Sequence, residues 1–150
     1  MKLRVLLADD HMLFRTALRM VLELAPDIEV VGEAADGLSV LKAVGECNPD
    51  VVCMDLSMPN LDGIEATRQL LAIYPQVKVI GLSAHVEPQR VAQMINAGAL
   101  GYVLKMDVGS ELLPAIRSVS RNQTYLSTEL GLQGVTDLAK YAMQVGDAGQ

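Results

Sequence analysis

The chain has 150 residues, and 51% of them are hydrophobic, which is enough for one domain with a well-covered core. Its formal net charge of −6 argues against a strong nucleic-acid binder, because phosphate contacts need clustered Lys and Arg. No stretch approaches the ~18 consecutive apolar residues of a membrane span, and "MKLRVLLADDH" is a poor secretory signal. We therefore expect no membrane association.

Short apolar runs alternate with segments of helical period. Strands are expected at residues 3–8, 28–35, 50–55, 77–83 and 99–105. Helices are expected at residues 14–25, from 37 onward, at 64–74, at about 87–97 and around 112–119, where apolar residues recur at spacings of three and four. The strands are apolar throughout, which predicts burial on both faces and a parallel sheet. Right-handed crossovers then give an α/β, doubly wound sandwich of five strands and five helices.

The segment after the fifth helix is polar and contains two glycines, which predicts a linker over residues 123–133. Residues 134–150 are expected to form a C-terminal helix and tail, with an apolar stripe that a partner or the rest of the chain must cover. Residues 107–150 carry three basic and five acidic side chains. This balance is wrong for a DNA-reading module.

Two cysteines are present, Cys47 near the end of a predicted helix and Cys53 in the third strand. Without a CxxC pair or a third thiol, we interpret both as reduced packing residues of a cytoplasmic protein. His11 and His85 lack Cys or acid partners at ligand spacing, so the sequence does not indicate zinc.

Charged and polar residues end four of the predicted strands. Asp9 and Asp10 follow the first strand, Asp55 ends the third, Ser83 the fourth and Lys105 the fifth. In a parallel sheet these ends meet at one edge, where ligands bind. Converging carboxylates raise one another's pKa, and a divalent cation with oxygen ligands relieves the repulsion. A carboxylate nucleophile with Mg²⁺, a lysine and a hydroxyl suits phosphoryl transfer to an aspartate.

Each of these residues also has a simpler interpretation. Asp10 before a helix is a natural N-cap, Ser83 a turn residue and Lys105 a solvated side chain. Their convergence on one edge favours a site.

The segments "LLADDH", "VVCMDLSMPNLDGIEATRQL", "VIGLSAH" and "GALGYVLK" resemble the receiver domain of two-component response regulators. The resemblance covers residues 1–122 and implies a flavodoxin-like strand order of 2-1-3-4-5. It implies that Asp55 is the phosphoacceptor, which takes the phosphoryl group from a sensor histidine kinase. Asp10 would bind Mg²⁺ (or Mn²⁺) directly and Asp9 through water, with Asp55 and the backbone carbonyl of Ser57.

The same resemblance assigns the remaining residues of the site. Lys105 would pair with the phosphoryl oxygens, Ser83 would swing in to bind the phosphate, and Tyr102 would rotate inward with it. A packed tyrosine is the alternative for Tyr102. Ser57 and His85 would be the flanking positions where the family tunes hydrolysis. Many receivers have a cis proline after the lysine, whereas Met106 here predicts a trans peptide.

The fifth helix and the linker look like LuxR/NarL-type regulators, in which a DNA-binding helix-turn-helix follows. Only its last helix has a counterpart here, in "GLQGVTDLAKYAMQVG". We therefore expect a phosphorylation switch whose output is homodimerisation or partner binding, in a lineage that regulates transcription.

Two alternatives stay open at this stage. One is a DNA-binding transcriptional regulator with a shortened output domain. The other is a phosphatase with an aspartate nucleophile, but that chemistry needs a second Asp two residues later, where Ser57 stands.

Overall fold

The structure is a computed structural model that describes residues 1–127. Its strands are β1 (Leu3–Ala8), β2 (Ile28–Ala34), β3 (Val51–Asp55), β4 (Lys78–Ser83), β5 (Gly101–Leu104) and β6 (Tyr125–Leu126). Its helices are α1 (Met12–Glu23), α2 (Gly37–Cys47), α3 (Gly63–Ile73), α4 (Pro88–Asn96) and α5 (Val108–Ser120), with a 3₁₀ turn, η1, at Lys105–Asp107. The C-terminal helix predicted over residues 134–150 lies outside the described residues.

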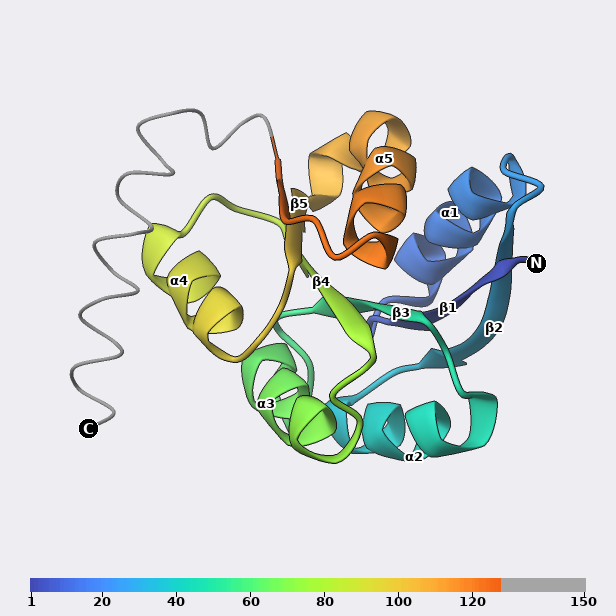
Figure 1. The fold of residues 1–150 in the computed structure, drawn as a ribbon. Helices are drawn as coiled ribbons and strands as arrows, with labels where there is room; N and C mark the ends of the chain where they lie inside the picture. Colours follow the sequence, from blue (N-terminus) through green and yellow to red (C-terminus); the bar gives the residue numbers. More distant parts are fainter. Residues whose placement is uncertain (128–150) are drawn as a thin grey trace.

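The strands form one parallel sheet in the order β2-β1-β3-β4-β5-β6. The five predicted strands therefore have the predicted order, and helices cover both faces (Figure 1). Helices α1 and α5 pack on one face, and α2, α3 and α4 pack on the other. Successive residues of β3 belong to opposite cores, Val52 and Met54 to one and Val51 and Cys53 to the other. This double burial explains why the strand is apolar throughout.

The sixth strand was not expected. Tyr125 and Leu126 pair in parallel with Gly101 and Tyr102 of β5, inside the segment predicted to be a linker. The backbone N–H of Ser127 also donates to the Tyr102 carbonyl at 2.9 Å. A two-residue strand is too short to produce a periodic pattern, so its pairing depends on tertiary contacts.

Helices α2 and α3 both begin at an aspartate. The side chain of Asp36 accepts a hydrogen bond from the Ser39 N–H, and Asp62 accepts one from the Glu65 N–H. Such N-caps satisfy backbone donors that the first helical turn leaves free. They fix where each helix starts, and the cap at Asp62 also fixes the loop that follows Asp55.

Gly63, at the first position of α3, packs directly against the end of β3. A Cβ at this position would lie 2.1 Å from the backbone oxygen of Asp55, which no side chain can tolerate. The Gly63 N–H donates to the Leu56 carbonyl at 2.9 Å. The glycine therefore lets the loop return closely beneath Asp55 and holds that residue at the sheet edge.

Both cysteines are free thiols, Cys53 buried in the core and Cys47 half-buried. The described residues contain no cis peptide bond, so the expected trans peptide before Met106 is confirmed. None of the helices within residues 1–127 is long and apolar enough to cross a membrane.

Candidate functional site

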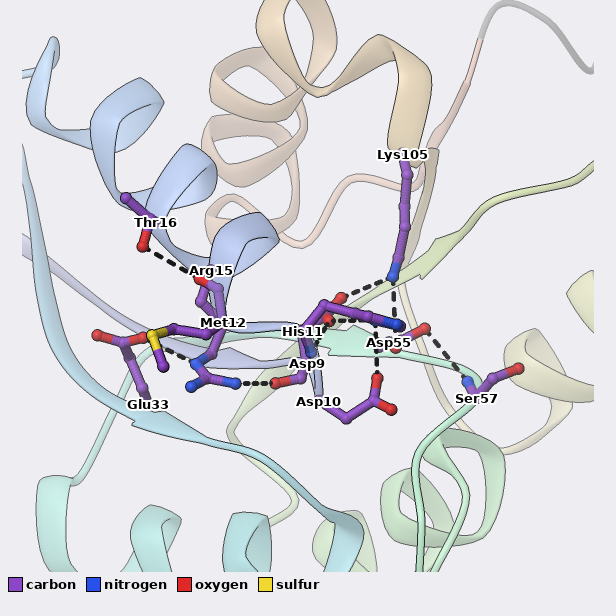
Figure 2. A network of polar contacts seen from close by, with 10 residues as sticks. All are labelled: Asp9, Asp10, His11, Met12, Arg15, Thr16, Glu33, Asp55, Ser57 and Lys105. Atoms are coloured by element: carbon purple, nitrogen blue, oxygen red, sulfur yellow. Dashed lines mark hydrogen bonds and ion pairs between the residues drawn. The ribbon is translucent and has the colours of Figure 1, made fainter.

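The carboxyl ends of β1 and β3 bring the predicted acids together. Ala8 pairs with Met54 across the two neighbouring strands, so the residues that follow each strand lie side by side. Ligand atoms of Asp9, Asp10, His11 and Asp55 all lie within 4.8 Å of one another. Figure 2 shows these side chains converging at the end of the sheet, with Lys105 approaching from the opposite side.

Lys105 contacts both buried acids. Its Nζ lies 2.7 Å from Asp9 Oδ2 and 3.3 Å from Asp55 Oδ2, and only 17% of its side chain is exposed (Figure 2). The lysine follows β5, two strands away from β3 in the sheet. Its long side chain therefore carries one positive charge across the edge of the sheet to a pair of negative ones.

The surroundings of Asp55 make its charged form less favourable than it would be in water. The residue is 3% exposed, and burial together with the charge of Asp9 raises its pKa to about 6. Lys105 and the Ser57 N–H, which donates to Asp55 Oδ1 at 3.2 Å, oppose this rise without cancelling it. The carboxylate thus has fewer favourable partners than a buried charge needs, and additional positive charge would stabilise it.

Asp9 is fully buried, whereas Asp10 is exposed at the mouth of the site. The N-cap of α1 is His11, so the alternative interpretation of Asp10 as the N-cap is wrong. Asp9 Oδ1 instead accepts a hydrogen bond from the His11 N–H at 2.8 Å. Asp10 therefore does not cap α1 and lies exposed at the mouth of the site.

His11 does have acid partners, contrary to the expectation from its spacing. Its Nδ1 lies 3.3 Å from Asp9 Oδ1 and 3.1 Å from Asp10 Oδ1 (Figure 2). The contacts arise because the chain turns into α1 directly after the two acids. The imidazole thus belongs to the same cluster of possible ligand atoms.

Ser83 and His85 lie on the other side of Asp55, at the end of β4. The Ser83 hydroxyl donates to the His85 carbonyl at 2.9 Å. Both residues line a pocket of about 160 Å³ together with Asp55, Ser57 and Lys105. All the residues predicted for phosphate binding and for tuning hydrolysis thus face one small cavity.

Tyr102, the predicted switch residue, is fully buried on β5. It belongs to the core on the side of α2, α3 and α4. Its ring therefore packs in the core.

Three further residues support the site and were not singled out from the sequence. The Arg15 guanidinium donates to the backbone oxygen of Asp9 at 2.5 Å and to Glu33 Oε1 at 2.9 Å (Figure 2). Arg90 lines the pocket and donates to the Leu56 carbonyl at 3.3 Å. Phe14 places its ring 4.6 Å from Lys105 Nζ. Contacts to backbone oxygens and to ring faces have no spacing signature, so no pattern in the sequence assigned these three residues to the site.

The donor set suits a hard divalent cation. Besides the His11 imidazole it contains carboxylate oxygens from two neighbouring strand ends, and one of these acids, Asp55, is destabilised in its charged form. Such ions prefer oxygen ligands and commonly take only one or two carboxylates from the protein. Asp9, Asp10 and Asp55 could hold the ion, with space in the adjoining pocket for further ligands.

Comparison with known proteins agrees with this geometry. The response regulator receiver domain family matches residues 5–117, more than half of the chain. The chain therefore belongs to the response regulator receiver domain family.

Its relatives are regulators of the LuxR/NarL lineage. The chain is 42% identical over 128 residues to the transcriptional regulatory protein LiaR of Bacillus subtilis, a match that covers 85% of this chain and 61% of LiaR. A LuxR-family two-component response regulator from Aurantimonas sp. SI85-9A1 superposes with a TM-score of 0.83 at 30% identity, covering 93% of this chain and 97% of that one. The signal receiver domain of a NarL response regulator from Mycobacterium tuberculosis gives 0.76 at 35% identity, covering 81% and 98%.

The chain spans only about half to three fifths of the length of the curated relatives it matches. The part they share contains the receiver domain, which is a regulatory domain.

Proposed function

We propose that this receiver domain accepts a phosphoryl group on Asp55 from the phosphohistidine of a sensor histidine kinase, in a Mg²⁺- or Mn²⁺-dependent reaction. The observation that carries the proposal is the position of Asp55, which is buried at the strand end beside Asp9 and Lys105 and lines a pocket of about 160 Å³. In the transfer, a carboxylate oxygen of Asp55 forms a bond to phosphorus while the bond from phosphorus to the imidazole nitrogen breaks. The imidazole leaves with the electron pair of that bond.

Each residue of the site then has a role that follows from its contacts. Asp10, Asp55, the Ser57 carbonyl and, through water, Asp9 would hold the cation, which neutralises charge on the phosphoryl oxygens. Lys105 would exchange its contact with Asp55 for one with a phosphoryl oxygen. These groups are positioned before the reaction, which is how most of the barrier to phosphoryl transfer is lowered.

The residues at the end of β4 and on β5 would change their contacts once Asp55 is phosphorylated. The Ser83 hydroxyl, now bonded to the His85 carbonyl, would turn to the phosphate, and Tyr102 would then be held inward. Ser57 and His85 flank the pocket and would control access of the hydrolytic water.

The proposed output is a change in association. We infer that phosphorylation shifts a two-state equilibrium felt at α4, β5 and α5 and that the phosphorylated chain forms a homodimer or binds a partner. The relatives of this chain are transcriptional regulators, which supports control of transcription as the wider role of the protein. The C-terminal part of the chain carries more acidic than basic residues, which argues against DNA binding by this chain alone.

The test is labelling with a small phosphodonor such as acetyl phosphate. With Mg²⁺, intact mass should increase by one phosphate, whereas the Asp55→Asn variant and wild type with EDTA should stay unlabelled. Light scattering of the same samples reports association. Labelling of Asp55→Asn as strong as that of wild type would rule out the assignment.

A further inference from the structure

Phe14 lies against the ammonium group of Lys105, which also contacts Asp9 and Asp55. The ring centroid is 4.6 Å from Lys105 Nζ, within the ~6 Å range of a cation–π contact. Phe14 stands in the first turn of α1 and is half-buried against the core that α1 and α5 share. The Lys105 ammonium therefore contacts an aromatic ring as well as two carboxylates.

An aromatic face differs from a third acid in one respect that matters for this site. It attracts the ammonium through the ring quadrupole but accepts no strong hydrogen bond, so the N–H donors remain free for oxygen atoms. It also keeps water from one side of the cation, whose side chain is only 17% exposed. A less hydrated ammonium interacts more strongly with charge that develops next to it.

We propose that Phe14 is a positioning residue for phosphoryl transfer, whose ring holds the Lys105 ammonium over Asp55. This inference rests on the proposed function of Asp55. Without the ring, the Lys105 ammonium loses one of the contacts that hold it beside Asp9 and Asp55. Its average position would then be farther from the oxygen that must be stabilised during the transfer.

The chain offers an unusually clean test because Phe14 is its only phenylalanine. Growth with 3,4,5-trifluorophenylalanine replaces this one ring by a ring of similar shape whose face is no longer negative. We expect the initial rate of phosphorylation by acetyl phosphate and Mg²⁺ to fall about 3- to 10-fold, the range of a partly desolvated cation–π contact. Phe14→Leu should show a similar loss, and Phe14→Tyr should retain the rate.

Two controls separate this role from a general effect on folding. Leu13→Ala removes a neighbouring side chain of α1 that is 86% exposed, and it should phosphorylate at the wild-type rate. The fluorinated protein should unfold at the wild-type urea midpoint, because the packing volume of the ring is nearly conserved.

A second measurement requires no phosphorylation. In the unphosphorylated protein, the ring current of Phe14 should shift the Lys105 ε-methylene protons upfield in a ¹³C-resolved NMR spectrum. Phe14→Leu should move them toward random-coil positions, with Lys105→Arg providing the assignment.

The outcomes distinguish the two proposals. If the fluorinated and Phe14→Leu proteins react at the wild-type rate, or if the Lys105 resonances do not move, the role of Phe14 is refuted while phosphorylation of Asp55 stands. If Asp55→Asn is labelled like wild type, the proposed function itself fails. A slower reaction of both Phe14 variants together with shifted Lys105 resonances supports the inference.

Discussion

Two buried carboxylates in this domain have opposite surroundings. Glu111 of α5 is 6% exposed, and its two oxygens accept hydrogen bonds from the Tyr125 hydroxyl at 2.8 Å and the Ser127 hydroxyl at 2.9 Å. Asp55 is 3% exposed, but it has one backbone N–H and one shared lysine and lies next to the charge of Asp9. The Glu111 carboxylate links α5 to β6 and the residue after it. The Asp55 carboxylate is buried and repelled by Asp9, and a bound cation would relieve that repulsion.

The difference shows how one fold separates stability from chemistry. A buried polar group with all its hydrogen bonds satisfied stabilises a unique packing, whereas one left with competing charges costs stability and is held in place by the rest of the fold. We therefore expect that substitutions at the two carboxylates have opposite effects on stability and that only one of them affects phosphorylation.

The largest effect is expected for Glu111→Ala. This change removes the acceptor of the half-buried Tyr125 hydroxyl and the nearer acceptor of the buried Ser127 hydroxyl, which keeps only Asp107 Oδ2 at 3.4 Å. The free energy of unfolding should fall by about 3 kcal/mol. Urea unfolding at pH 7 measures the loss, and phosphorylation by acetyl phosphate should remain at the wild-type rate at temperatures where the variant is folded. The matched control is Ser110→Ala, on the exposed side of the same helix, with a change below about 0.5 kcal/mol. A stability loss for Glu111→Ala no larger than that of this control would contradict the comparison.

The next effect has the opposite sign. Asp55→Asn should raise the free energy of unfolding by about 2 kcal/mol at pH 7.5 in EDTA, because it removes a buried charge that Asp9 repels. The pKa of Asp55 near 6 is higher than that of a free aspartate, so the folded state binds the proton more tightly than the unfolded state. Wild-type stability relative to the variant should therefore recover as the pH falls through about 6, and the difference should be small near pH 4. Urea unfolding of both proteins at a series of pH values in EDTA checks this.

Charged groups distant from residue 55 contribute equally to wild type and Asp55→Asn, so the difference between the two proteins reports residue 55 and its interactions with the charges next to it. A difference that stays constant from pH 4 to pH 8 would show that charge at this position is not the cause.

The smallest effect is expected for Tyr125→Phe. The change removes one donor to Glu111 and keeps the ring, so the loss should be about 1 kcal/mol in urea unfolding at pH 7. Burial and the neighbouring Glu111 raise the pKa of Tyr125 to about 12, so its hydroxyl stays a donor at this pH. Tyr74→Phe is the control, because the Tyr74 hydroxyl makes no hydrogen bond with the described residues. Equal losses for the two variants would argue against a specific role of the Tyr125 hydroxyl.

The fold and the main site residues could be predicted from the sequence for one physical reason. Parallel strands covered on both faces must be apolar along their length, so a charge such as Asp55 at the end of a strand marks the open edge of the sheet. Because all parallel strands open toward the same edge, Asp9 and Lys105 could be placed beside Asp55 although 96 residues separate the two in sequence (105 − 9 = 96).

The rest depended on contacts that leave no pattern in the sequence. Phe14 fits the apolar stripe of its helix, and nothing in its spacing distinguishes a core residue from one that lies over a lysine. The partners of Glu111 could not be anticipated either, because β6 has only two residues and is stabilised by side chains of α5. Tertiary packing decided both cases.

The short β6 strand also determines how much backbone the edge of the sheet exposes to other molecules. Within residues 1–127, β6 pairs with the side of β5 that β4 leaves free, so the edge presented there is only two residues long. The opposite edge strand, β2, carries Glu29 and Glu33. Short and charged edges are poor templates for a strand of another molecule and protect a protein from edge-to-edge aggregation. Chains that associate through this domain are therefore expected to meet through their helices and not by extending one sheet into the next.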